Sequence, residues 1–179
     1  QWVARYNGTG NNWDVPTSLV VDNSGNVFVT GSSQSSNAIG SEDYLTIKYS
    51  ANGNEEWTIR HNGPSSYSDF ATSMAIDELG NIYVTGSCYS VASMNDYVTI
   101  KYSSGGIQQW IRFYNGPLNG SDLPKMLVMD NNGYIYVTGS SPGNGTSIDF
   151  ATVKYDLAGT ELWVARYNGT LNNYDIPYA

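Results

Sequence analysis

The chain offers few side chains that could catalyse a reaction, and its single histidine and single cysteine are the first to consider. His61 stands alone, so a metal site with two histidine ligands cannot form within this chain. Cys88 has neither a second cysteine nor a histidine near it in the sequence, which favours a partly buried thiol over a nucleophile. The sequence shows no serine–histidine–aspartate order and no glycine-rich phosphate loop. It therefore predicts no catalytic centre and no cofactor.

Most of the other charged residues recur at fixed intervals of 53 to 55 residues. They include three series: Asp14, Asp69, Asp122 and Asp175; Asp43, Asp96 and Asp149; and Lys48, Lys101 and Lys154. A charge that recurs at every interval is expected to support a scaffold rather than to form one active site. Hydrogen bonds or ion pairs between neighbouring elements would satisfy such groups, since an unpaired buried charge is expensive.

The sequence from Asp22 to Asn26 and its copies superficially resemble calcium-binding loops. They lack the alternating carboxylates and the ligand at the twelfth position that such a loop needs. An aspartate that accepts backbone amide hydrogens, followed by a glycine with positive φ, is instead typical of a tight hairpin turn. We therefore expect turns at these places and no metal site.

These charges are positioned by one unit that is written three times. The copies are DNSGNVFVTGSS from Asp22, DELGNIYVTGSC from Asp77 and DNNGYIYVTGSS from Asp130. Four tryptophans keep the same intervals: Trp2, Trp57, Trp110 and Trp163. Such strict self-similarity indicates one supersecondary unit stacked on copies of itself.

Each unit reads as four short antiparallel strands with no helical periodicity. In the first unit they are SLVVD, NVFVTG, DYLTIKYS and EWTIRHNG, and small residues such as Ser18 and Ser73 suit a crowded place where strands converge. Both faces carry apolar or aromatic residues, so both must be covered, as in the radially stacked blades of a β-propeller. A β-sandwich, the alternative, would not explain a period near 53 with identical landmarks. The predicted divisions are a lone outer strand and loop (1–13), blades at 14–68, 69–121 and 122–174, and the start of a next blade (175–179).

The three motifs, in the same order and spacing, closely resemble the bacterial SBBP β-propeller repeats. The pattern is D-x-x-G-N-[VI]-[FY]-V-T-G-S, then D-[YF]-x-T-[IV]-K-Y, then W-V-A-R-Y-N-G. The resemblance implies an all-β propeller, often seven-bladed, in large secreted or cell-surface proteins, and it implies no catalytic residues. Two positions depart from the pattern: Phe113 takes the slot of Arg5, Arg60 and Arg166, and His61 takes that of Tyr6, Tyr114 and Tyr167.

Three complete blades are too few to close a ring, because propellers use about four to eight. We expect a six- to eight-bladed ring whose further blades come from the same polypeptide or from another copy, with residues 1–8 completing a neighbouring blade. The chain begins and ends inside a repeat, which suggests a piece of a longer polypeptide. The net charge of −8 argues against nucleic acid and anionic membrane surfaces, and no apolar run is long enough for insertion into a membrane.

Two connections in each unit are short and uniform, and two are longer and varied. Antiparallel strands place the two kinds on opposite rims, and the varied rim is rich in Tyr, Ser, Gly and Asn, as in adaptable recognition surfaces. The candidate ligand-binding residues are Trp13, Tyr67, Tyr89, Lys125, Tyr174 and Tyr178. The favoured function is a non-enzymatic extracellular scaffold or protein-interaction module. The alternative is a glycan-binding propeller whose rim aromatics stack on sugars, and an enzyme is the least favoured.

Overall fold

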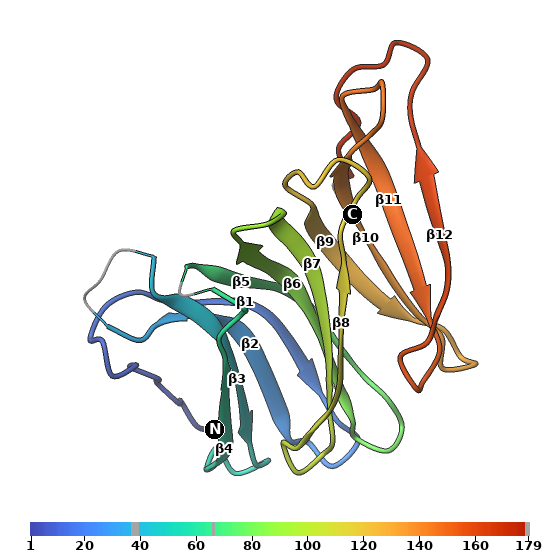
Figure 1. The fold of residues 1–179 in the computed structure, drawn as a ribbon. Coiled ribbons are helices and arrows are strands. Elements are labelled where there is room, and N and C mark those ends of the chain that lie inside the picture. Colours follow the sequence, from blue (N-terminus) through green and yellow to red (C-terminus); the bar gives the residue numbers. More distant parts are fainter. Residues whose placement is uncertain (37–39, 66, 178–179) are drawn as a thin grey trace.

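The computed structural model describes residues 1–36, 40–65 and 67–177, and within these ranges all regular structure is β-strand. The strands are β1 Asp14–Val21, β2 Val27–Gln34, β3 Glu42–Tyr49, β4 Glu55–His61, β5 Asp69–Ile76, β6 Ile82–Ser90, β7 Met94–Tyr102, β8 Gln108–Tyr114, β9 Leu123–Met129, β10 Ile135–Pro142, β11 Ile148–Tyr155 and β12 Glu161–Tyr167. They form three four-stranded antiparallel sheets in chain order, which fan out beside one another (Figure 1). We call them the first, second and third blades. The predicted all-β fold of antiparallel propeller blades is confirmed, while the number of blades in a complete ring stays a prediction.

The tight turns share one backbone design. They span residues 22–26, 50–54, 77–81, 103–107, 130–134 and 156–160, and each has a glycine with positive φ at its fourth position. In the first, the Gly25 amide donates to the Asp22 carbonyl, and the Asp22 amide donates to the Asn26 carbonyl. The Asp22 carboxylate also accepts the amides of Ser24 and Asn26, both at 2.9 Å. The carboxylate is thus used within the turn, as the hairpin interpretation expects.

The first strands of the three blades lie next to one another, since β5 contacts both β1 and β9. Small hydroxyl side chains make the junctions. The Met74 amide donates to Ser18 Oγ at 3.3 Å, and the Leu127 amide donates to Ser73 Oγ at 3.1 Å. The crowded position expected for these serines is confirmed, with an added role for the hydroxyl: it satisfies a backbone amide of the next blade.

The hydrophobic core lies between the blades rather than within one. Each blade has a leading face, which includes Leu45 and Ile47 in the first blade, and a trailing face, which includes Phe28, Tyr44 and Trp57. The trailing face of the first blade packs on the leading face of the second, and the second blade packs on the third in the same way. Because a fully buried large apolar side chain contributes about 1.5–3 kcal/mol, these two interfaces hold the arc of blades together.

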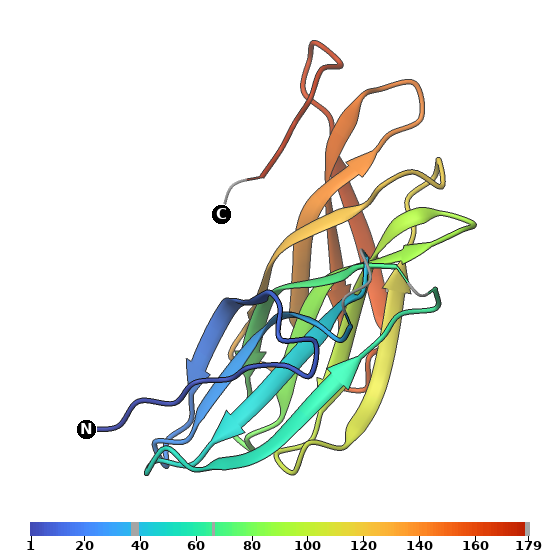
Figure 2. The ribbon, with the colours of Figure 1, turned by 90° about the vertical axis from the view of Figure 1, so that its left-hand side faces the viewer.

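Residues 1–7 do not form the strand that the sequence predicts. The strand with which they would pair belongs to a preceding blade, and no such strand is present in the described part of the chain. They nevertheless lie against the leading face of the first blade, where Ala4 and Tyr6 pack on its core and the Trp2 indole donates to the Ala51 carbonyl at 2.9 Å. Figure 2 shows this segment as a trace alongside the first blade.

The same tryptophan contact occurs at both complete interfaces. The Trp57 indole donates to the Ser104 carbonyl at 3.2 Å, and the Trp110 indole donates to the Leu157 carbonyl at 3.1 Å. Residues 1–7 therefore occupy the place of a preceding blade's outer strand without having its conformation. Among the described residues, no helix is long and apolar enough to cross a membrane.

Candidate functional site

The two ends of the blades differ in their connections. The six tight turns lie at the lower end in Figure 1, and the longer connections lie at the upper end. We call the upper end the long-loop rim. It includes residues 35–36, 40–41, 62–65, 67–68, 91–93, 115–122 and 143–147, together with 8–13 and 168–174 at the two flanks. The predicted separation of uniform and varied connections onto opposite rims is confirmed, although the connections 91–93 and 143–147 on the varied rim are no longer than the tight turns.

Aspartates anchor the loops that lead into each first strand; Asp69 and Asp122 are buried, and Asp14 and Asp175 are half-buried. Asp14, Asp69, Asp122 and Asp175 each accept the amide of the glycine six residues earlier, at distances of 2.9, 2.5, 2.6 and 2.6 Å. Burial raises the pKa of Asp69 and that of Asp122. The scaffold role expected for this series is confirmed.

Asparagine pairs brace the same loops. The Asn7 amide donates to Asn11 Oδ1 at 2.7 Å, and the pairs Asn115–Asn119 and Asn168–Asn172 have the same distance. The acceptor asparagine has positive φ in all three loops. Asparagine tolerates this conformation better than most residues do, which explains why the loop uses it. These loops are therefore fixed platforms.

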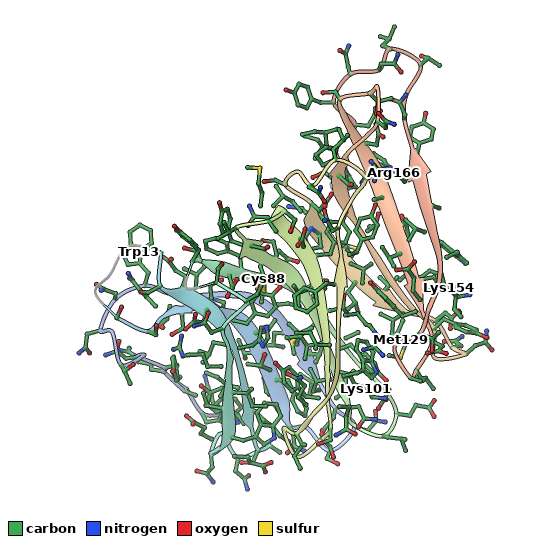
Figure 3. The ribbon with its side chains drawn as sticks, viewed as in Figure 1. Trp13, Cys88, Lys101, Met129, Lys154 and Arg166 are labelled. Carbon is green, nitrogen blue, oxygen red and sulfur yellow. The ribbon has the colours of Figure 1, made fainter. Side chains whose placement is uncertain are left out.

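Two of the candidate aromatic residues stand at equivalent places on these platforms. Trp13 is 78% exposed and Tyr174 is 70% exposed, each directly before an anchoring aspartate. Figure 3 shows Trp13 projecting from the end of the first blade, away from the sheets. In the other two loops the equivalent residues are Ser68 and Ser121. The exposed aromatic platform is thus a property of particular repeats.

Tyr67 and Tyr89 are brought together, which their separation in the sequence does not reveal. Their ring centroids lie 4.8 Å apart with an interplanar angle of 59°. Tyr67 is exposed on the β4–β5 loop, and Tyr89 is half-buried near the end of β6. The Ser65 hydroxyl donates to the Tyr89 carbonyl and ties the loop to this strand. The pair forms a second aromatic surface on the rim.

Two other candidates do not join this set. Lys125 lies on β9, exposed at the irregularity between Pro124 and Met126, so its predicted place on the long-loop rim is wrong. β9, the first strand of the third blade, begins at Leu123, so Lys125 lies within the strand and not in the loop. Tyr178 lies outside the described residues. The structure does not test ligand binding by any of the six candidates.

An arginine network closes the rim end of the third blade. Arg166 donates to Tyr114 Oη of the second blade at 2.7 Å, to Ser141 Oγ at 2.6 Å, and to Asp149 at 3.3 Å. In the first blade Arg60 makes the equivalent contacts to Ser33 and Asp43.

The two departures from the repeat, His61 and Phe113, stand at the positions of Tyr114 and Arg166, but at the interface between the first and second blades. Strand pairing places Phe113 at the position of Arg166 and His61 at the position of Tyr114. Asp96, the counterpart of Asp149, therefore has no arginine; Ser93 Oγ donates to one oxygen at 2.5 Å, and the other has no partner. Burial raises the pKa of Asp96 and lowers that of His61. The sequence showed both departures but not their connection.

Cys88 takes the position of Ser33 and Ser141, and it is buried. Burial, together with the neighbouring Asp69 carboxyl, raises the pKa of the thiol well above its usual range. A protonated and buried thiol is a poor nucleophile, in agreement with the expectation from sequence.

The lysine series serves the scaffold. Lys48 pairs with Glu56 at 2.8 Å and lies over the Phe28 ring at 5.4 Å, while Lys101 lies over Tyr83 at 5.1 Å. Lys101 and Lys154 lie far from Trp13 in Figure 3. Among the described residues, no group of three or more His, Cys, Asp or Glu side chains is arranged to hold a metal ion.

The fold and its repeated contacts define a β-propeller repeat protein. The SBBP beta-propeller repeat matches residues 1–37 and 57–90, so these two segments carry that repeat.

Two proteins illustrate what the chain is similar to. An uncharacterized WD repeat-containing protein of Acanthamoeba polyphaga mimivirus is 27% identical over 186 residues, which cover 88% of this chain and 13% of the viral protein. The chain therefore spans only a small part of that relative. A fucose lectin from Kordia zhangzhouensis, solved in complex with methyl-fucoside, is 17% identical with a TM-score of 0.48, over 85% of this chain and 99% of the lectin.

Proposed function

We propose that this chain is a non-enzymatic β-propeller module that binds carbohydrate through the aromatic side chains of its long-loop rim. One observation carries the proposal. Trp13, Tyr67 and Tyr174 are largely exposed, yet the loops that bear them are anchored by the half-buried Asp14 and Asp175 and the buried Asp69.

Rigid, exposed aromatic rings suit sugars for a physical reason. One face of a pyranose ring presents C–H groups, which pack on an aromatic surface, while its hydroxyls need polar partners at the edge. A hollow of about 350 Å³ beside Tyr174 supplies such partners, since Thr170, Asn173 and Asp175 also line it. Because the loop backbones are already anchored, binding would order little beyond the aromatic side chains themselves.

The position of the titratable groups supports a role without catalysis. Cys88 is buried, and the Nε2 atom of His61 is buried without a hydrogen-bond partner. Neither group can reach a ligand on the long-loop rim. The recurring aspartates and lysines are engaged in anchoring loops and packing blades.

A second candidate is a protein-interaction scaffold, which the open trailing face of the third blade favours. Trp163 and Tyr167 are exposed there, and aromatic side chains are enriched at protein interfaces. Secretion or display at the cell surface stays a prediction from the resemblance alone.

A glycan array probed with the labelled chain tests the proposed function. We expect binding to a defined set of glycans, abolished by Trp13→Ala. The matched control is Leu79→Ala, which removes an exposed apolar side chain on the opposite rim and should leave binding unchanged. Equal signal from the wild type and Trp13→Ala, or no signal from the wild type, would refute the role of Trp13. Capture of a protein that survives Trp13→Ala and fails with Trp163→Ala would favour the second candidate.

A further inference from the structure

The two outer flanks of the arc are a trailing face and a leading face, the two surfaces that pack on each other between neighbouring blades, and here neither is covered. On the third blade Trp163 is 42% exposed, whereas its equivalent Trp110 is 9% exposed under the next blade. On the first blade Leu19 is 58% exposed, whereas its equivalent Met74 is 5% exposed. The trailing face of the third blade and the leading face of the first blade therefore lack the neighbours that the same surfaces have inside the arc.

At the complete interfaces an aromatic side chain of the third strand locks one blade to the next. The Tyr97 hydroxyl donates to the Ser140 carbonyl at 3.3 Å and lies 2.6 Å from the point that a Cβ atom on Gly139 would occupy. Tyr44 lies in the same way against Gly86, at 2.5 Å from the equivalent point. Glycine leaves the space into which the tyrosine reaches.

The first blade has the equivalent socket without a third-strand tyrosine hydroxyl in it. A cavity of about 240 Å³ is lined by Gly31, Ser32 and Leu45 of the leading face and also by Tyr6 of the N-terminal segment. Gly31 is the equivalent of Gly86 and Gly139, but the three atoms nearest its missing Cβ are backbone atoms of Val15 and Pro16, whereas Gly86 and Gly139 each meet a tyrosine hydroxyl there. The unused counterpart is Phe150 on the third blade, which stands at the position of Tyr44 and Tyr97 and packs on Tyr167 of its own blade.

We propose that a second copy of this chain docks head to tail, so that Phe150 of one copy enters the Gly31 socket of the other. The contact continues the geometry of the two internal interfaces. Residues 162–168 (LWVARYN) match residues 1–7 (QWVARYN) at every position but the first, and the latter already lie on the leading face. An outer strand of this sequence is therefore compatible with that surface.

Residues near both ends of the chain occupy positions that residues of the second copy would take. Trp2 occupies the tryptophan site at Ala51, which Trp163 of the other copy would take. The Asp175 amide donates to the Ile148 carbonyl at 2.7 Å, as the Asp122 amide donates to Asn95 at 2.6 Å, so residues 175–177 occupy the place where β1 of the other copy would begin. Docking thus displaces residues 1–7 of one copy and residues 175–177 of the other. At that junction Asp14 of the incoming copy takes the place of Asp175, and its Trp13 takes the place of Tyr174 as the rim aromatic.

Two copies would supply six blades, which is within the range of about four to eight that propellers use. The contact joins different surfaces of the two copies, and such a heterologous contact forms a closed ring when the rotation between copies closes. The exposed apolar flanks would be covered at both junctions.

Sedimentation velocity of the 179-residue chain over a range of concentrations tests the docking. We expect a reversible dimer, with a mass of twice 19.6 kDa, whose dissociation constant falls at least roughly tenfold when residues 1–7 are deleted, since the competing segment is then absent. Phe150→Ser should weaken the dimer by a similar factor. Phe70→Ser is the matched control, because Phe70 is exposed on β5.

Thermal unfolding of each variant shows whether the monomer remains folded. If the Phe150→Ser variant is unfolded, Val29→Phe is the alternative test. The new phenylalanine would fill the Gly31 socket, so that Phe150 of the other copy, which is retained, could not enter it. A monomer at all concentrations, with and without residues 1–7, would overturn the proposal and leave blades of the same polypeptide as the occupant. A dimer that both Phe150→Ser and Val29→Phe leave unchanged would also overturn it.

Discussion

Restoring the missing arginine network should strengthen the interface between the first and second blades. The perturbation is the double substitution His61→Tyr with Phe113→Arg, which copies the Tyr114–Arg166 contact to the equivalent place. The introduced guanidinium would face the Asp96 oxygen that accepts from Ser93, as Arg166 faces the Asp149 oxygen that accepts from Thr146. The introduced phenol would face the guanidinium across the interface.

The magnitude follows from the groups involved. A hydrogen bond to a charged group contributes about 1.5–3 kcal/mol, and losing the packing of a half-exposed phenylalanine costs about 1 kcal/mol, so Phe113→Arg alone should stabilise by about 1 kcal/mol. His61→Tyr alone buries a hydroxyl without a partner and should destabilise by about 1–2 kcal/mol. Together the two groups satisfy each other, which predicts a coupling free energy of about 2 kcal/mol.

The assay is a double-mutant cycle on the free energy of unfolding in denaturant, accompanied by thermal unfolding. A coupling of about 2 kcal/mol corresponds to roughly 4–8 °C in Tm for a domain of this size. Phe113→Met is the control, since it removes the ring without supplying a cation. Additive effects of the two substitutions, or a double variant less stable than His61→Tyr alone, would refute the reasoning that these positions form one contact.

Three further outcomes follow from the same structure. Asp96→Asn should raise the free energy of unfolding by about 1 kcal/mol at pH 7. Burial raises the pKa of Asp96 above its value of 3.8 in the unfolded chain, so the wild type regains this stability as the pH falls through the folded-state pKa. The difference in unfolding free energy between variant and wild type should therefore be smaller at pH 4 than at pH 7, and an equal difference at both would contradict it. Lys48→Met should lower the free energy of unfolding by about 0.5–1 kcal/mol through loss of the Glu56 pair while any glycan binding persists, and loss of a ligand with unchanged Tm would be the contrary result. Gly139→Ala should destabilise by at least about 2 kcal/mol because a Cβ would overlap the Leu123 carbonyl and crowd Tyr97. Gly105→Ala, whose Cβ would meet only Ser103 Oγ at 3.9 Å, should be nearly neutral, and similar Tm values for the two variants would contradict this.

Repetition explains why much of the fold could be predicted from the sequence. Six turns of one design, each with a glycine of positive φ, separate strands whose two faces are both apolar. Local turn chemistry and face patterning agree in every unit, so blade architecture, strand order and the opposite rims follow from them. The small serines on the first strands were likewise identifiable, although their hydrogen bonds to the next blade were not.

The contacts between units could not be predicted in the same way. Tyr67 and Tyr89 meet only because a loop folds over the end of β6, and no periodicity encodes that meeting. His61 and Phe113 are 52 residues apart, and their connection requires the interface between blades. Residues 1–7 have the composition of a strand, but a strand also needs a partner, and sequence pattern alone does not show whether one is present. The sequence pattern places Lys125 in the loop because it does not show that β9 already begins at Leu123.

The central claim, that the long-loop rim binds carbohydrate, is tested most directly by indole NMR signals. The five tryptophans give five indole N–H signals, and Trp2, Trp57 and Trp110 donate theirs to backbone carbonyls at the interfaces of the blades. The experiment titrates the chain, labelled with nitrogen-15 in tryptophan, with a glycan that scores on the array. Binding at the long-loop rim should produce a saturable shift of the Trp13 signal with the interface signals unchanged. A shift confined to Trp57, Trp110 or Trp163, or no shift at saturating glycan, would contradict it.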